Sequence, residues 1–319
     1  MALAVELPFV TLDVFTTQRY KGNPLAIVTI PKGTTPYPTQ DQKQRIAREF
    51  NYSETVFVHE HHPDHNGTPH DARHIDIFVT DAELPFAGHP TIGTATHLLP
   101  QSITTLITKA GPIAIGHHQP AAGTVVASIP HDTHLHASRL RSLAASLRPG
   151  DLSPDHEIRA AELDAPVFSI VRGMTFCLVE LPSLDALSRV TLTPAVFRPE
   201  DLLDELWRQG FIGRYYFVRL GGRSGRGGDG EDVVSIRSRM MAPPFEDPAT
   251  GSAACALSSY LTLTSGNRDD RTVTYKVDQG VEMGRESNIV VEITTKAAEI
   301  DKVCLSGTAT QVMRGFVTV

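Results

Sequence analysis

The sequence has few cysteines, no long apolar run and no excess of positive charge. Three cysteines among 319 residues is an odd, sparse count that favours a reduced, cytoplasmic protein. No segment approaches the roughly 18 apolar residues of a membrane span, and the first residues lack the basic segment of a signal peptide. Acidic residues outnumber basic ones by 36 to 29, which disfavours a nucleic-acid partner. We therefore expect a cytoplasmic protein that acts on a small molecule, without a nucleic-acid or membrane partner.

Several common active-site motifs are also missing. The chain has no Cys-x-x-Cys, Gly-x-Ser-x-Gly or phosphate-binding Gly-Lys-Ser/Thr motif. Residues 225–230 match a dinucleotide-binding glycine pattern, but they precede a predicted strand, whereas that pattern should follow a strand and open a helix. Six of the 14 histidines lie between His59 and His74 among residues typical of an exposed loop, so we expect no metal site there.

The length and the small residues give the first positive indications. At about 150 residues per domain, 319 residues indicate two domains, and 41% hydrophobic residues are enough for each to bury a core. The 24 glycines and 22 prolines are numerous, and many of them fall in two loops of small residues.

Alternating and continuous apolar segments predict a chain rich in strands. Strands are expected at residues 9–15, 25–28, 55–58, 75–79, 124–129, 167–170, 175–181, 215–220, 233–240, 272–277, 288–293, 303–306 and 315–319. Helices are expected from the capping box that begins at Thr39 as far as Phe50, from Pro90, over residues 199–209, and after Gly251. Asn51 is suited to the left-handed position that ends the first of these helices.

The two halves of the chain resemble each other. Each has strands, then a loop with acidic residues and proline, then a glycine that opens a helix of alanine, serine and threonine. These helices begin near Gly88 and Gly251. A duplicated domain is the interpretation we favour, and it predicts a ligand-binding cleft between two similar lobes.

The two glycine-led helix starts are candidate binding sites. Small residues let a ligand approach the backbone, and the free amides of a helix start attract anions. Close packing of helix on sheet would use the same residues. For either loop alone packing is the better explanation, whereas the pair together favours function.

Three side chains near these segments could transfer protons. Glu54 stands before an apolar strand, where desolvation would raise its pKa and make it a base, although a solvated glutamate at an exposed strand start is the more frequent case. His89 could donate to a substrate or simply hold a turn. Asp247 could cap the second helix or act as an acid, and capping is the better expectation. Cys255 has no basic neighbour that would indicate a thiolate.

Five motifs occur in a characteristic order. They are Asp13-Val14-Phe15 with Gly22-Asn23-Pro24, the segment Asn51–Val58, the segment Glu83–Pro90, Arg237-Ser238-Arg239-Met240, and the segment Glu246–Ala254. Together they resemble the phenazine-biosynthesis PhzF-like family over essentially the whole chain. The enzyme that names this family isomerises dihydro-hydroxyanthranilate by moving a proton between ring carbons.

The resemblance implies an α/β fold of the diaminopimelate-epimerase-like type. This fold has two pseudo-symmetric lobes, each a mostly antiparallel sheet wrapped around a central helix, with the active site in the cleft between the lobes. The last strand returns to the first lobe, so we expect residues 1–118 and about 308–319 in one lobe and 119–307 in the other. The resemblance also implies a homodimer that needs no cofactor and no metal.

The resemblance assigns roles to particular residues. Glu54 matches the family's proton-transferring glutamate, and His89 and Asp247 match its histidine and aspartate. The residues that match substrate-binding positions are Asn23, Ser53, Gly88, Gly251 and Ser252. Related epimerases use two opposed cysteines, but this chain has Ala87 and Thr250 in those neighbourhoods, so a mechanism with two thiols is not expected.

The resulting hypothesis is a cofactor-independent isomerase that moves a proton between carbons of a small carboxylate-bearing substrate, with Glu54 as the acid and base. The alternatives are a catalytically silent binding protein of the same fold and an amino-acid racemase or epimerase. The His59–His74 and Gly221–Gly230 segments look longer than the family pattern requires, and they would alter substrate choice if they border the cleft. The substrate itself stays open.

Overall fold

The structure is a computed structural model that describes residues 5–61, 67–118, 123–221, 232–266 and 269–319. It divides into two compact units, Met1–Ile129 with Leu305–Val319, and Pro130–Cys304. The first boundary thus follows Ile129 rather than residue 118. The difference arises because the strand after residue 118 pairs with a strand of the first unit.

In its described residues, the first unit contains two helices of ordinary length among its strands. The strands are β1 (Glu6–Val14), β2 (Asn23–Ile30), β3 (Glu54–His59), β4 (Ala72–Phe78), β5 (Glu83–Leu84), β6 (Thr105–Thr108), β7 (Gly111–His117), β8 (Val125–Ser128) and β18 (Ala309–Thr318). The helices are α1 (Gln40–Phe50), α2 (Gly88–Leu98) and the short η1 (Leu99–Gln101).

The part of the second unit that the structure describes has one long helix and several short ones. Its strands are β9 (His134–Arg139), β10 (Pro166–Val171), β11 (Gly173–Glu180), β12 (Gly210–Leu220), β13 (Asp232–Ala242), β14 (Phe245–Asp247), β15 (Arg271–Gln279), β16 (Ser287–Lys296) and β17 (Glu299–Gly307), the last of which ends in the first unit. Its helices are η2 (Leu140–Leu143), α3 (His156–Asp164), α4 (Leu184–Ser188), α5 (Pro199–Leu202), η3 (Glu205–Trp207) and α6 (Gly251–Thr264).

The same order of strand pairing occurs twice. In the first unit β1–β2 is antiparallel, β2–β3 parallel, β3–β4 and β4–β5 antiparallel, β4–β6 parallel and β6–β7 antiparallel. In the second unit β10–β11, β11–β12, β12–β13, β13–β14, β13–β15 and β15–β16 repeat this series of orientations. Helices α2 and α6 occupy equivalent places, after β5 and after β14. This repetition supports the duplication that the sequence suggested.

Each sheet packs around its own central helix. In α2 every residue from Gly88 to Ala95 is buried, and in α6 every residue from Gly251 to Ser259 is buried. Helix α2 packs against β1, β2, β3, β8 and β18, and α6 packs against β10, β11, β15 and β16. A helix that is covered on all sides needs small side chains, which explains its glycine, alanine, serine and threonine content.

Local sequence signals place α1 correctly. The Thr39 side chain accepts from the backbone of Gln42, the Gln42 side chain accepts from the backbone of Thr39, and Asn51 adopts the left-handed conformation at φ 53°. The predicted capping box and stop are therefore confirmed.

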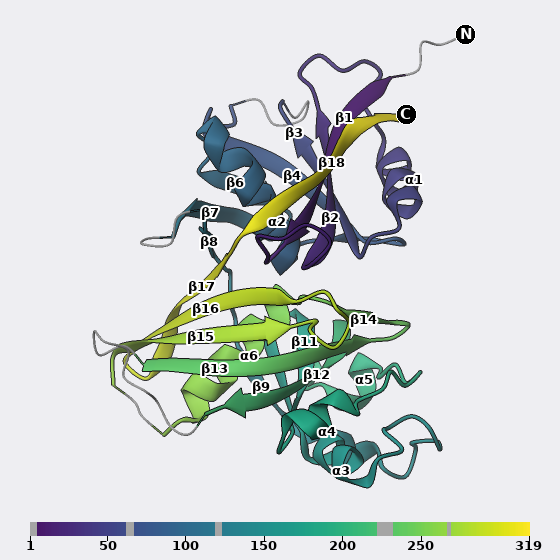
Figure 1. The fold of residues 1–319 in the computed structure, drawn as a ribbon, viewed down its shortest axis with the longest axis vertical. Helices are drawn as coiled ribbons and strands as arrows, with labels where there is room; N and C mark the ends of the chain where they lie inside the picture. Colours follow the sequence, from purple (N-terminus) through teal and green to yellow (C-terminus); the bar gives the residue numbers. More distant parts are fainter. Residues whose placement is uncertain (1–4, 62–66, 119–122, 222–231, 267–268) are drawn as a thin grey trace. The chain divides into compact units, whose positions relative to one another are not determined.

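The last strand closes the first unit. β18 pairs antiparallel with β1, from Glu6 opposite Thr318 to Val14 opposite Ala309, and Figure 1 shows β18 in yellow beside β1 in purple. The first and last strands thus pair in one sheet, as expected for the returning strand.

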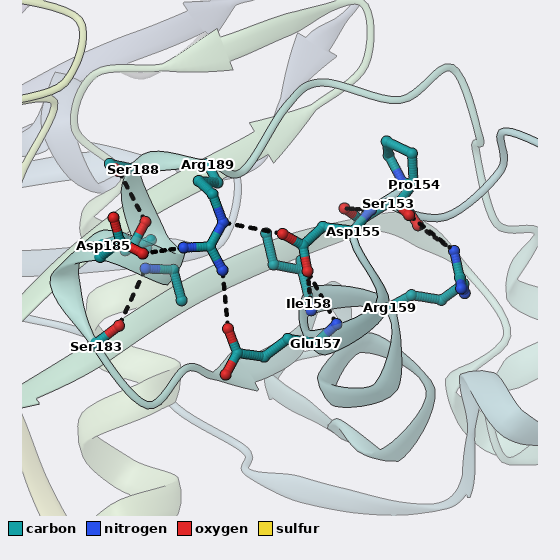
Figure 2. Close-up of polar contacts among 12 residues, drawn as sticks. Ser153, Pro154, Asp155, Glu157, Ile158, Arg159, Ser183, Asp185, Ser188 and Arg189 are labelled. Atoms are coloured by element: carbon teal, nitrogen blue, oxygen red, sulfur yellow. Dashed lines mark hydrogen bonds and ion pairs between the residues drawn. The ribbon is translucent and has the colours of Figure 1, made fainter.

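Ion pairs connect two short helices of the second unit, α3 and α4. Asp155 caps α3 by accepting from the backbone of Glu157 and Ile158. The Arg189 guanidinium lies 2.9 Å from both Asp155 and Glu157 and also pairs with Asp185 of α4 (Figure 2). This one arginine therefore links the start of α3 to α4.

Some predicted elements were wrong or missing. The helix expected over residues 199–209 is broken into α5 and η3, and α3, α4, β6, β7 and β9 were not predicted. Helix α2 begins at Gly88 rather than Pro90, because the first turn of a helix leaves its N–H groups unbonded and tolerates proline there. No helix among the described residues is long and apolar enough to cross a bilayer.

His59 does not belong to the exposed loop that the sequence indicated. It is the last residue of β3, only 1% exposed, and its Nε2 lies 2.9 Å from Asp76 Oδ2 while Nδ1 contacts the Tyr37 hydroxyl. Residues 62–66 of that segment, and 222–230 of the glycine-rich loop, lie outside the described residues.

The close approach of α2 to the sheet predicts a packing defect. A Cβ at Gly93 would lie 2.5 Å from Leu25 Cδ2 and 2.9 Å from Val14 Cγ2, so we expect Gly93→Val to lower the free energy of unfolding by about 1–3 kcal/mol. Chemical denaturation would measure this. Gly116→Val is the control, because the nearest atom to a Cβ there is 4.0 Å away. Equal losses in the two variants would contradict the proposed close packing.

Candidate functional site

Glu54 is placed by the end of one helix and the start of one strand. The left-handed Asn51 ends α1, and Glu54 is then the first residue of β3. Because β2 and β3 are parallel with Leu25 opposite Glu54, the first residues of both strands lie at the same end of the sheet. Asn23, the first residue of β2, is thereby brought close to Ser53 and Glu54.

The Glu54 carboxyl group is largely removed from water. Its side chain is 15% exposed, and among the described residues Oε2 has no hydrogen-bond partner. Burial raises the pKa of Glu54 to about 7. The position of Glu54 in the sequence favoured a solvated carboxyl group, and this expectation is wrong.

His89 is held next to Glu54 by a short chain of polar contacts. It is the second residue of α2, is 3% exposed, and its Nδ1 lies 3.3 Å from Asn23 Nδ2 and 3.6 Å from Glu54 Oε2. Ser53 Oγ donates to Asn23 Oδ1 at 3.4 Å, which turns the amide nitrogen toward the histidine. Nδ1 then accepts from Asn23, so the ring proton belongs on Nε2. The structure therefore brings Asn23, Ser53, Glu54 and His89 together.

The starts of the two central helices are suited to negative charge. Neither Ala87 nor Thr250, the residues that precede them, provides a side-chain cap, and neither helix has an acidic residue in its first turn. The N–H groups of Gly88, Gly251 and Ser252 lie in these first turns, where backbone donors have no partner within the helix. The partial positive charge of each helix start is thus available to an anionic group.

Asp247 belongs to a second polar group, in the second unit. It ends β14, and its Oδ2 accepts from the Thr250 hydroxyl at 2.5 Å, while its backbone oxygen accepts from Gln279 Nε2 at 2.7 Å. Asp247 therefore fixes the residue that precedes α6 and is not the N-cap of that helix, which corrects the expected capping role. Gly251 and Ser252 follow directly in α6.

Sequence reasoning missed Gln279, the centre of this group. Its Oε1 accepts from the Thr250 backbone and from the Tyr215 hydroxyl, both at 3.1 Å. A signal was present in Gly280, whose φ of +74° and whose contacts leave no room for a side chain: a Cβ would lie 2.6 Å from the Pro248 carbonyl oxygen. That glycine lets β15 end tightly against the loop before α6.

The cysteines are not placed for acid–base work. Cys255 is fully buried in α6, and burial raises the pKa of its thiol far above the usual range. Ala87 and Thr250 occupy equivalent positions, each immediately before a central helix. All three cysteines are buried, and none of them forms a disulfide bond within the described part of the chain.

The comparison with known families is decisive. The family described as phenazine biosynthesis-like protein (PhzC-PhzF) matches residues 12–315. The chain belongs to this family. The resemblance inferred from the five motifs is therefore confirmed.

Two relatives of this PhzF-like chain align over nearly their whole length. An uncharacterised isomerase of Mesorhizobium japonicum is 32% identical, over 96% of this chain and 97% of its own. The trans-2,3-dihydro-3-hydroxyanthranilate isomerase of Pseudomonas fluorescens is 30% identical, over 97% and 98%. The names of both relatives agree with the enzyme class expected from the sequence.

Solved structures support the fold. A PhzF-family protein of Bacillus anthracis is 23% identical with a TM-score of 0.71, covering 99% of this chain and 100% of its own. A probable proline racemase of Agrobacterium radiobacter is 13% identical with a TM-score of 0.57, covering 98% of this chain and 92% of its own. The PhzF-like chain thus has the expected diaminopimelate-epimerase-like fold.

The raised pKa of Glu54 predicts an effect on stability. The folded chain holds this proton up to about pH 7, whereas the unfolded chain releases it near 4.5, so the folded state loses stability as pH rises through that range. The Glu54→Gln variant has no proton to release and should not show this loss. At pH 8 its free energy of unfolding should exceed that of the wild type by up to about 3 kcal/mol, and at pH 4.5 the two should differ little. Denaturation series at both pH values would measure it.

Glu49→Gln on α1 is the matched control, because Glu49 is exposed. A difference between wild type and Glu54→Gln that stays constant with pH would contradict the desolvated carboxyl group.

Proposed function

We propose that this PhzF-like protein is an isomerase that moves a proton between two carbons of a small carboxylate-bearing substrate, without a cofactor. The proposal rests above all on the Glu54 carboxyl group, with its pKa of about 7 and its buried, unbonded Oε2. A base is most effective when its pKa lies near the working pH, and a glutamate with an ordinary pKa is a weaker base at that pH. Desolvation supplies that adjustment here.

The proton transfer balances within the substrate and Glu54. Ionised Glu54 takes a proton from one carbon, and the electron pair of that C–H bond is delocalised into the adjoining unsaturated system. The protonated carboxyl group then returns the proton to a second carbon, so the substrate is neither oxidised nor reduced. The same carboxyl group removes the proton and returns it. Exchange of that proton with solvent therefore competes with its transfer to the second carbon.

Other polar groups of the two units have supporting roles in this proposal. The Nε2–H of His89 donates to a substrate heteroatom, while Asn23, which accepts from Ser53, holds the ring in place. The amides of Gly88, Gly251 and Ser252 bind the substrate carboxylate and the developing negative charge. Asp247 transfers a proton to or from a second heteroatom of the substrate. The Asp247→Asn variant tests that role separately.

The substrate proposed for the first test is trans-2,3-dihydro-3-hydroxyanthranilate, the compound named in the Pseudomonas fluorescens relative. It has the carboxylate and the acidic C–H bond that the proposed mechanism requires. A racemase with two thiol bases is disfavoured, because Ala87 and Thr250 precede the two central helices and burial raises the pKa of the Cys255 thiol. The expected homodimer and the cytoplasmic location stay predictions.

Turnover in deuterated water tests the role of Glu54. We expect solvent deuterium on a substrate carbon with the wild type, and a loss of turnover of about 100- to 10,000-fold in Glu54→Gln, because an amide cannot take up the proton. Mass spectrometry of the product reads out both effects. Glu49→Gln, which removes an exposed carboxylate from α1, should keep full turnover.

Full turnover and labelling in Glu54→Gln would refute the assignment of the base. If carboxylate compounds raise the melting temperature of the wild type but none is converted or labelled, the chain is a binding protein and the isomerase proposal is wrong.

A further inference from the structure

The hydrogen bonds around Gln279 use every hydrogen-bonding position of its amide group. Gln279 is the last residue of β15 and is completely buried. Its Oε1 accepts from the Thr250 backbone N–H and from the Tyr215 hydroxyl, both at 3.1 Å. Its Nε2 donates to the Asp247 backbone oxygen at 2.7 Å and to Thr250 Oγ1 at 3.1 Å. We call Gln279, Thr250 and Asp247 the Asp247 network.

The Asp247 network has one direction. A backbone N–H only donates and a backbone carbonyl only accepts, so Oε1 of Gln279 faces the Thr250 nitrogen and Nε2 faces the Asp247 carbonyl oxygen. Thr250 Oγ1 therefore receives an N–H from Gln279, and its own hydrogen is donated to Asp247 Oδ2. A carboxyl oxygen that accepts in this way carries no proton. The network thus favours the ionised form of Asp247.

The equivalent positions of the first unit cannot form such a network. The strand registers pair each of its members with a residue of the first unit. For Asp247, Thr250 and Gln279 these residues are Leu84, Ala87 and Thr108. The Thr108 hydroxyl donates within its own turn, to the Gly111 oxygen.

The difference between the two units separates function from packing. Helix α2 is buried from its first residue, as α6 is, although Leu84 and Ala87 give its start no side-chain hydrogen bond. A central helix can therefore be packed into its sheet without these polar contacts. What they add in the second unit is a fixed orientation and protonation state for Asp247.

We propose that Gln279 and the Thr250 hydroxyl are positioning groups for Asp247. Gln279 directs the hydroxyl, and the hydroxyl holds the Asp247 carboxylate in one orientation as a proton acceptor. The inference rests on the proposed function, in which Asp247 exchanges a proton with a substrate heteroatom. It adds the direction of the first transfer. The proton moves from the heteroatom to Asp247, the bonding electron pair stays on the heteroatom, and the proton returns before the product leaves.

Thr250→Val tests the network with little disturbance, because valine has the shape of threonine without its hydroxyl. The Gln279 amide keeps both of its backbone partners in this variant. We expect kcat for trans-2,3-dihydro-3-hydroxyanthranilate to fall by about 10- to 100-fold, with KM changed by less than about threefold, since the lost contact orients a reacting group. Thr250→Ser restores the hydroxyl and should keep kcat within about threefold of the wild type.

Tyr215→Phe is the matched control. Tyr215 is as completely buried as Gln279, and its hydroxyl contacts Gln279 Oε1 and, at 2.8 Å, Ser238 Oγ. Phenylalanine removes these hydrogen bonds but leaves those from Gln279 to Thr250 and from Thr250 to Asp247. We expect Tyr215→Phe to lower the melting temperature at least as much as Thr250→Val does, and to keep kcat within about threefold of the wild type. Losses of kcat that follow the melting temperature in both variants would overturn the proposal.

The protonation state of Asp247 gives a second measurement, which does not need turnover. In a chain with isotope-labelled aspartate, NMR identifies the Asp247 carboxyl signal by its absence in Asp247→Asn. We expect this signal to titrate at least about half a pH unit higher in Thr250→Val and Gln279→Met than in the wild type, because a lost hydrogen bond to the ionised form favours the protonated form. Thr250→Ser and Tyr215→Phe should titrate as the wild type does.

The two measurements separate this proposal from the proposed function. If the Asp247 signal titrates alike in the wild type, Thr250→Val and Gln279→Met, the positioning role is wrong, whether or not the wild type is active. If the wild type converts no substrate but the signal shifts as expected, the isomerase proposal is wrong and the positioning role is supported. If circular dichroism shows that Gln279→Met does not fold, Thr250→Val against Thr250→Ser decides the matter alone.

Discussion

In each unit a curved sheet packs around one helix, and the small side chains of that helix decide how closely the strands can approach. Gly93 shows the constraint in α2, where a Cβ would overlap side chains of β1 and β2. The same arrangement buries the first turns of α2 and α6 at the ends of strands. Backbone amides and the residues beside them are thereby held in fixed positions, on which the whole candidate site depends.

The position of Glu54 follows from this packing. A carboxyl group at the start of an edge or solvated strand would keep an ordinary pKa, but here the neighbouring α2 and β2 remove water from it. The chain thereby accepts a buried group with an unsatisfied oxygen, which costs stability when the group is ionised. Such a cost is typical of residues retained for chemistry rather than for folding. His89 and Asn23 lie beside it because they occupy the starts of α2 and β2.

Local signals were sufficient where the structure depends on neighbours in sequence. Thr39, Gln42 and Asn51 define the ends of α1 through contacts within a few residues. Local signals were insufficient where contacts with distant segments of the chain decide the structure. Residues 199–209 have a helical pattern, yet the helix breaks at Leu203 and Asp204, because the Asp204 backbone and carboxylate bond to histidines of β9. Gln279 was missed for the same reason, since its partners at residues 215, 247 and 250 come from other elements.

The sequence by itself determined the family, the duplicated plan, most strands and the identity of Glu54, His89 and Asp247 as candidates, because these follow from motifs and from short-range periodicity. Only the tertiary structure decided that Glu54 is desolvated, that Asp247 holds Thr250 rather than capping α6, and that His59 is buried. It also brought His134, His136 and Asp204 together across a long stretch of chain. Burial and pKa depend on which distant atoms surround a group, and that is settled only when the sheets close around their helices.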